Sequence, residues 1–235
     1  MKKFSIALLA ALMAAPVTAG AYEGGAVSNG GSVAGVVKFK GAAAAPKKLD
    51  VNKDKEVCAK SPKSDPALIV AGDNLVNAVV YLTDIKKGKK IELAKVSMDQ
   101  NGCEYKPHVL AFPAGSSVDF INPDGILHNV RTESKANTPM NMAQPKFKKT
   151  LTQKFDKPEA IPVRCDVHGW MSGWLFVAAN PYFHVTDNSG SYRLTDVPPG
   201  EYTLEVWHAA LGKQSKKVTV KAKEEFKADF EFAKK

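Results

Sequence analysis

The sequence predicts an all-β fold, because short stretches of alternating apolar and polar residues recur along the whole chain. Glycine, proline, asparagine and aspartate separate these stretches, and no long segment repeats apolar residues at helical spacing. In the stretch from Val33 to Phe39, for example, alternation places Val33, Gly35, Val37 and Phe39 on one face. This pattern is typical of β-sandwiches with one buried face on each sheet.

The middle of the chain predicts further strands and two irregular connections. Strands are expected over residues 76–82, as two pieces of residues 105–121 joined at Pro113–Gly115, and over residues 161–165 and 173–178. Residues 41–67 are rich in alanine, proline, lysine and serine, and predict an extended loop held by Cys58. Residues 132–157 are polar and contain proline, and no strand is predicted there.

The first residues predict a secretory signal peptide over residues 1–21. Lys2 and Lys3 form a charged start, an apolar stretch follows from Phe4 to Ala15, and small residues come next. The mature chain is therefore expected to be exported, in a periplasm. No later apolar run approaches eighteen residues, so we expect no membrane span.

The segment from Cys165 to Met171 carries a thiolate, an imidazole and a thioether at the spacing Cys-x2-His-x2-Met. These soft ligands bind copper, and two histidines with one cysteine and a weak axial methionine are typical of electron-transfer copper sites. His128, followed by Asn129, is the candidate second histidine. Each residue alone is more often structural, as half of a disulfide, a capping group or part of a core. Their combination favours a metal site.

An isolated histidine followed by asparagine, and then a Cys-x2-His-x2-Met loop after a strand, resembles the cupredoxins, or blue copper proteins, and most of all their amicyanin branch. The resemblance implies a Greek-key β-sandwich over residues 86–180 and a hydrogen bond from Asn129 toward the cysteine-bearing loop. It also implies that one histidine lies near the surface and passes electrons to a redox partner. The implied ligands of a single copper ion are His128, Cys165, His168 and Met171.

The chain has three cysteines, so one thiol stays unpaired if a single disulfide forms in an oxidising compartment. Pairing Cys58 with Cys103 leaves Cys165 free, as a copper thiolate requires. Neither Cys58 nor Cys103 has a histidine or methionine two residues away. The alternative pairings of Cys165 would remove the proposed ligand.

The C-terminal part predicts a second module. A Thr-Asp-x-x-Gly turn at residues 186–190 and a Pro-Pro-Gly-x-Tyr turn at 198–202 resemble the carboxypeptidase regulatory-like, or transthyretin-like, β-sandwich. Matching Gly-x-Val and Ala-x-Val-x-Leu pieces occur far upstream, at residues 35–37 and 78–82. We therefore predict one discontinuous sandwich around the inserted cupredoxin of residues 86–180. Its two parts are residues 30–85 and 181–235. The simpler alternative is an N-terminal extension, a cupredoxin and a small C-terminal β-domain.

The predicted function is that of an exported copper protein that transfers electrons in the periplasm and is not an enzyme. The net charge of +9 is compatible with acidic partners, whereas export and the absence of a recognised motif argue against nucleic acid. One alternative is copper storage or delivery, with His108, Met140 and Met142 offering a second site. Another is a cell-envelope binding module without a redox role.

Overall fold

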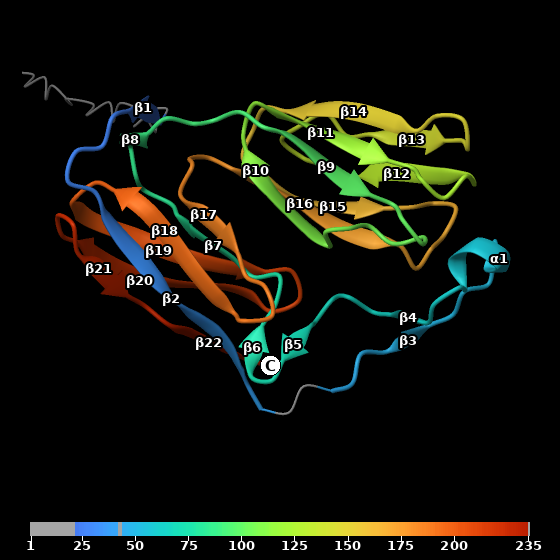
Figure 1. Cartoon of the computed structure of the whole chain (residues 1–235), viewed down its shortest axis with the longest axis horizontal. Helices are drawn as coiled ribbons and strands as arrows, with labels where there is room; N and C mark the ends of the chain where they lie inside the picture. The colour runs from blue at the N-terminus through green and yellow to red at the C-terminus, as the bar shows by residue number, and fades with distance from the viewer. Residues whose placement is uncertain (1–21, 42–43, 235) are drawn as a thin grey trace, which may run out of the picture.

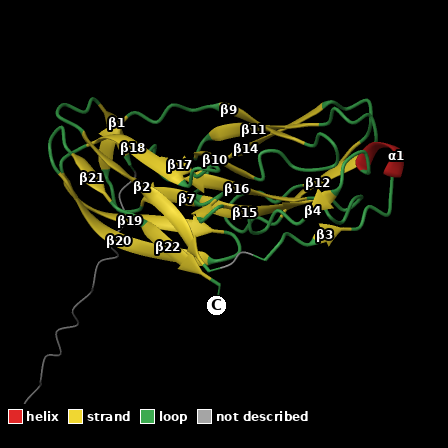
Figure 2. Cartoon of the chain, turned by 60° about the horizontal axis from the view of Figure 1, so that its bottom comes forward, coloured by secondary structure: helices red, strands yellow, loops and turns green. Residues whose placement is uncertain are grey.

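The computed structural model describes residues 22–41 and 44–234. The predicted signal peptide, residues 1–21, lies outside them. The described chain is almost wholly β-structure, with one short helix, α1 (Lys55–Cys58) (Figure 2). The all-β prediction is therefore confirmed. No helix among the described residues is both long and apolar enough to cross a membrane. The strands form two sandwiches that lie side by side (Figure 1).

The first sandwich uses strands from both ends of the chain. Strand β7 (Val79–Leu82) pairs antiparallel with β19 (Gly200–His208), and Leu204 lies opposite Leu82. This sheet has the order β17-β7-β19-β20. The second sheet has the order β18-β2-β6-β5, with β21 and β22 also paired to the long strand β2 (Gly31–Lys40). The other strands, including the separate β1/β8 pair, are β1 (Glu23–Gly25), β5 (Val70–Ala71), β6 (Asn74–Leu75), β8 (Lys87–Lys89), β17 (Phe183–Val185), β18 (Ser191–Val197), β20 (Gly212–Val220), β21 (Glu225–Lys227) and β22 (Phe230–Ala233).

One core fills this first sandwich. Val33, Val37 and Phe39 are buried along β2, as their alternation predicted. They pack in a cluster whose members lie at residues 33–85 and 182–232. Segments on either side of residues 86–180 therefore bury their apolar faces together.

A glycine is needed at the turn before β18. Gly190 has φ +64°, and an added Cβ would lie 2.8 Å from the carbonyl oxygen of Val37. The Gly190 amide donates to the carbonyl of Asp187, which closes the turn. Both the left-handed conformation and the close approach exclude a larger residue, which explains the glycine of the Thr-Asp-x-x-Gly pattern.

The second sandwich consists of a sheet with the order β10-β16-β15-β12-β13 and a sheet with the order β14-β11-β9. Its core includes Phe112, Phe120 and Phe155, and apart from Cys58 its buried members lie at residues 98–177. The predicted strand pair within residues 105–121 is present as β10 and β11. The strands are β9 (Lys95–Asp99), β10 (Val109–Pro113), β11 (Ser116–Ile121), β12 (His128–Thr132), β13 (Asn141–Gln144), β14 (Thr150–Phe155), β15 (Glu159–Arg164) and β16 (Ser172–Ala178).

Two of these strands lie in residues 132–157, where the sequence predicted no strand. Strand β14 alternates, with Leu151 and Phe155 buried and Thr152 exposed, and it forms the edge of its sheet. Its neighbour in the sequence, β13, is mostly exposed and has Gln144 as its one buried residue. Few apolar residues mark such edge strands, which is why the polar composition concealed them.

The segment between β2 and β5 leaves the first sandwich, runs along the second one to its far end and returns (Figure 1). We call residues 44–67 the strap. It carries α1 and a short pair of strands, β3 (Lys48–Leu49) and β4 (Lys63–Ser64). Cys58 at the end of α1 forms a disulfide with Cys103, the pairing that the sequence predicted. The strap is thus linked covalently to the second sandwich.

Candidate metal centre

Two neighbouring strands bring the candidate ligands together. His128 is the first residue of β12, and Cys165 follows the last residue of β15. Because β12 and β15 are antiparallel neighbours, the start of one and the end of the other lie at the same end of the sheet. His168 lies in the turn between β15 and β16, and Met171 directly precedes β16. The Met171 amide donates to the carbonyl of His168 (2.9 Å) and closes this turn.

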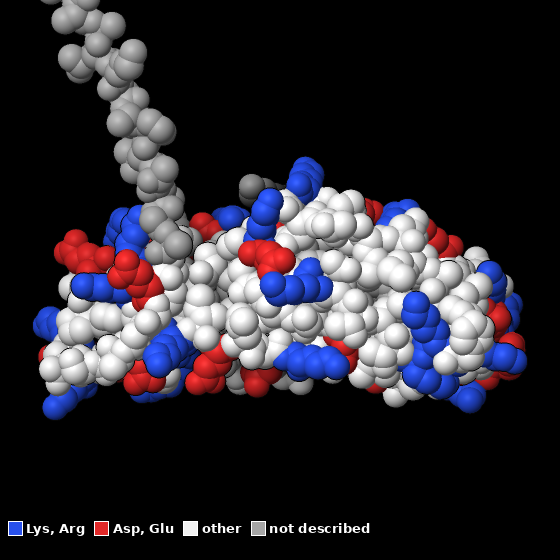
Figure 3. All heavy atoms as spheres, turned by 90° about the horizontal axis from the view of Figure 1, so that it is seen from above, with Lys and Arg blue, Asp and Glu red and all other residues white. Residues whose placement is uncertain are grey.

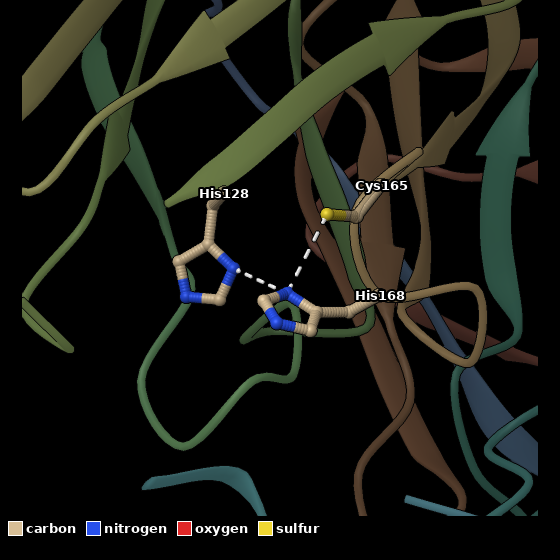
Figure 4. A group of neighbouring side chains, drawn as sticks. All are labelled: His128, Cys165 and His168. Carbon is tan, nitrogen blue, oxygen red and sulfur yellow. Dashed lines mark hydrogen bonds between the residues drawn. The ribbon is translucent and has the colours of Figure 1, made fainter. Parts of the chain in front are cut away.

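Three donor atoms converge at this end of the sheet (Figure 4). The Nδ1 atoms of His128 and His168 lie 3.1 Å apart, and Cys165 Sγ lies 3.9 Å from His168 Nδ1. All three donor atoms lie within 4.8 Å of one another. Both imidazoles are fully buried and Cys165 is 3% exposed. Met171, also buried, belongs to the same core cluster as Cys165.

The hydrogen bonds of the two imidazoles leave both Nδ1 atoms available to bind a cation between the rings. Nε2 of His128 donates to Asp124 Oδ2 (2.9 Å), and Nε2 of His168 donates to Asp54 Oδ2 (2.8 Å). An imidazole that donates from Nε2 carries its lone pair on Nδ1. Two lone pairs and a sulfur then face one another in a buried space, and a soft metal cation would satisfy all three. The donor set of two nitrogens and a thiolate suits copper.

The electrostatics favour a thiolate. Burial raises the pKa of Cys165, but hydrogen bonds from the imidazoles of His128 and His168 in their protonated form, and from the backbone amides of His168 and Asn129, outweigh it and lower the pKa to about 6. Burial likewise lowers the pKa of His128, but Asp124 and Cys165 outweigh it and raise the pKa overall. A cysteine that is deprotonated near neutral pH is prepared to bind a metal without a further proton loss.

Asn129 connects the two loops of the centre. Its Oδ1 accepts a hydrogen bond from the amide of Asp166 (3.2 Å), and its Nδ2 donates to Asn141 Oδ1 (2.8 Å). The carboxylate of Asp166 pairs with Arg131 at 3.0 Å, so its charge is partly balanced. These contacts hold the loop of Cys165 against the start of β12.

The expectation that one histidine lies near the surface is wrong. The strap covers His168, because Asp54 accepts a hydrogen bond from its Nε2. Helix α1 of the strap lies at the far end of the second sandwich (Figure 1). The Trp170 ring lies 5.1 Å from the His168 ring, and Trp170 Nε1 donates to the carbonyl of Cys103 (3.1 Å). Both sides of the histidine are therefore occupied by protein.

Asp54 and Asp124 are functional candidates that the sequence did not reveal. Asp124 lies four residues before His128 in the same loop, so this spacing was an available signal. Asp54 lies 114 residues from His168 and precedes Cys58 in a segment that reads as an irregular loop. In the sequence, the only signal that places Asp54 near the centre is the predicted pairing of its neighbour Cys58 with Cys103.

The residues considered for a second metal site are not joined to this centre by the contacts observed. His108 Nδ1 bonds the carbonyl of Ser172 (3.1 Å), and His108 belongs to neither cluster of potential ligands among the described histidines, cysteines and carboxylates. Met140 is buried and Met142 is 41% exposed. The second such cluster, formed by Cys103, Asp124 and His128, includes a disulfide-bonded sulfur and therefore offers no thiolate.

Comparisons with known proteins give likenesses of fold. No protein-family model matches the chain, and no curated protein matches it. A copper-containing nitrite reductase from Thermus scotoductus SA-01 is 20% identical, with a TM-score of 0.34, over 49% of this chain and 27% of its own. A purple cupredoxin from Nitrosopumilus maritimus is 18% identical, with a TM-score of 0.31, over 36% of this chain and 100% of its own.

Amicyanin from Paracoccus versutus is 17% identical, with a TM-score of 0.33, over 38% of this chain and 86% of its own. This chain thus spans little more than a quarter of the nitrite reductase and most of the two smaller proteins. At these identities and TM-scores the likenesses carry no conclusion about the chemistry of this chain.

Proposed function

We propose that this chain is an exported protein that binds one copper ion in a type 1 site and transfers electrons in the periplasm. The ligands in this proposal are His128, Cys165, His168 and Met171. A copper ion held by two imidazoles, a thiolate and a thioether changes between Cu(I) and Cu(II) with little rearrangement, which favours rapid electron transfer. Four protein ligands leave no strong open position for a substrate, so we propose a carrier and not an enzyme.

The observation that carries this proposal is the convergence of three buried donor atoms. The two Nδ1 atoms and the Cys165 sulfur lie within 4.8 Å of one another, and both remaining imidazole nitrogens are hydrogen-bonded to carboxylates. A buried structural cysteine packed only against apolar side chains would instead have a raised pKa. The hydrogen-bonded thiolate is therefore better explained as a ligand.

Absorption and EPR spectra of the copper-loaded mature protein, together with metal analysis, test the proposal. We expect one copper per chain and an intense visible band from charge transfer between the Cys165 thiolate and Cu(II). Copper bound without this band would instead support storage or delivery. A chain that takes up no copper would support a cell-envelope binding module.

Burial of the ligands favours electron transfer over storage or delivery. Sites that exchange metal rapidly are open, whereas both imidazoles here are fully buried and the strap covers one of them. We propose that the redox partner approaches the end of the second sandwich at which the candidate ligands converge. On the face shown in Figure 3, basic side chains are scattered among acidic ones, so this face does not favour a partner of one strong charge.

We also propose that the first sandwich is a regulatory-like domain into which the cupredoxin is inserted, with residues 30–85 and 181–235 around residues 86–180. The pairing of β7 with β19 and the common core of the two flanking segments support this division. Two chain crossings and a shared apolar contact, which includes Phe176 and Trp207, restrict movement between the sandwiches. The first sandwich would then serve as a scaffold for the metal centre.

A further inference from the structure

One acidic side chain reaches the candidate metal centre from outside its own sandwich. Asp54 belongs to the strap, and its Oδ2 lies 2.8 Å from Nε2 of His168. The side chain of Asp54 is 30% exposed, whereas the imidazole is fully buried. The strap thus supplies the only polar partner observed for this nitrogen among the described residues.

The backbone of Asp54 indicates that this contact has a specific role. Asp54 stands at the N-cap of α1 in the left-handed conformation, with φ 48° and ψ 44°. An aspartate in the N-cap position usually accepts a hydrogen bond from the amides of its own helix, but this side chain makes no such bond. A residue in an uncommon conformation whose carboxylate turns away from its own helix toward a distant histidine is typical of a functional contact.

The position of this carboxylate is fixed by nearby covalent and hydrogen bonds. The carbonyl of Asp54 accepts from the amides of Val57 (3.0 Å) and Cys58 (2.9 Å). Cys58 is fully buried and is bonded to Cys103. Asp54 is therefore held within one helical turn of a covalent link to the second sandwich, which limits the positions that its carboxylate can adopt.

We propose that Asp54 is a positioning residue of the metal centre. Its carboxylate accepts a hydrogen bond from Nε2–H of His168 and so keeps the lone pair of this imidazole on Nδ1, facing His128 and Cys165. The role of Asp54 toward a bound metal rests on the proposed copper site, whereas its effect on the tautomer of His168 does not. The strap is thereby part of the centre: it orients one ligand as well as covering it.

Long-range ¹H–¹⁵N NMR of the histidine rings in the metal-free full chain tests the tautomer directly. We expect wild-type His168 to carry its proton on Nε2. Asp54→Ala is expected to raise the fraction of His168 protonated on Nδ1. Asp54→Asn is expected to keep the wild-type tautomer, because its Oδ1 still accepts a hydrogen bond.

Two control variants separate the side chain from other effects. Asp54→Gly removes the carboxylate but suits the left-handed backbone, so it separates the effect of the side chain from any backbone strain. Asp50→Ala, at an exposed position of the same strap, is the matched control.

Copper affinity, measured by competition with a chelator, gives the second readout. We expect Asp54→Ala and Asp54→Gly to weaken binding about 10- to 100-fold and Asp50→Ala to leave it unchanged. An unchanged His168 tautomer in Asp54→Gly, or an equal change in Asp50→Ala, would overturn the inference while the copper proposal stands. If wild type binds no copper although the tautomer follows Asp54, the proposed function fails, and with it the role of Asp54 toward a metal.

Discussion

The two histidines of the candidate centre have similar surroundings that arise in different ways. Both are fully buried, and each donates from Nε2 to a carboxylate. The partner of His128 is Asp124, from the same loop, whereas the partner of His168 is Asp54, from a strap that is remote in the sequence. One half of the centre is thus formed by local sequence, and the other half is completed only when a distant segment docks.

The disulfide connects the two halves. Asp54 lies within a helical turn of Cys58, and the carboxylate of Asp124 accepts from the amides of Gly102 (2.8 Å) and Cys103 (2.9 Å). Trp170, beside His168, donates to the carbonyl of Cys103. A covalent bond outside the ligand set therefore supports both carboxylates, and its removal should affect the remote half more than the local half.

The largest expected effect comes from the ligand that both halves share. Cys165→Ser should abolish the intense visible band of the copper-loaded protein, because a hydroxyl does not provide a thiolate for charge transfer. The β-core and the two histidines remain, so circular dichroism should stay close to that of wild type.

The matched control for this substitution is the double variant Cys58→Ser/Cys103→Ser, which removes two other sulfurs and keeps Cys165. It should retain the visible band when loaded with copper. A full-strength band in Cys165→Ser would show that this residue is not a ligand, whichever half of the centre dominates.

The same double variant should lower stability by about 4 kcal/mol in the metal-free protein, as estimated from the entropy of a loop that spans 45 residues. Denaturant unfolding measures this change. The strap should loosen first, so a chelator should remove copper faster than from wild type. Unchanged unfolding and unchanged copper release would contradict the view that the disulfide holds the remote half.

Removing each carboxylate in turn compares the two halves directly. Asp124 is 6% exposed as a side chain and accepts three hydrogen bonds, whereas Asp54 is 30% exposed. We expect Asp124→Ala to cost about 2–3 kcal/mol of unfolding free energy. For Asp54→Ala we expect less than about 1 kcal/mol, because solvent screens an exposed pair. Thermal or urea unfolding of the metal-free variants shows which substitution costs more. An equal cost would mean that the Asp54 contact contributes as much to stability as the Asp124 contacts.

The candidate ligands could be predicted from sequence because they stand in short patterns along the chain. The spacing of Cys165, His168 and Met171, and the asparagine after His128, indicated ligands without any knowledge of the fold. Period-two alternation likewise marked the central strands, whose buried faces require apolar residues. These features are fixed by neighbours in the chain.

The contacts made by the strap could not be predicted in this way. No periodicity or motif in residues 44–67 indicates that Asp54 meets an imidazole, because the contact depends on how two distant segments pack. The mistaken expectation of an exposed histidine has the same cause. The polar edge strands β13 and β14 were missed because edges bury few side chains.

A third buried histidine, His208, shows how burial changes the pKa of an imidazole that has no carboxylate partner among the described residues. His208 ends β19, is 2% exposed, and its Nδ1 accepts from the amide of Ala210 (3.3 Å). Burial lowers the pKa of His208, a hydrogen bond with the backbone of Val76 partly opposes this, the charge of His108 adds to the lowering, and the resulting pKa is about 4. In His128, by contrast, Asp124 and Cys165 outweigh the effect of burial and the pKa is raised.

The last expected effect follows from this difference and appears only in acid. With a pKa near 6.5 when unfolded and about 4 when folded, His208 takes up its proton more readily in the unfolded chain. Its contribution is therefore absent above pH 6.5, and stability is lost as the pH falls toward 4, by up to about 3 kcal/mol. Urea unfolding of the metal-free protein at pH 7, 5.5 and 4 should show a smaller acid loss for His208→Gln than for wild type. Parallel pH profiles for the two proteins would mean that His208 is protonated equally in both states, and that a buried histidine in this fold needs no carboxylate to hold its charge.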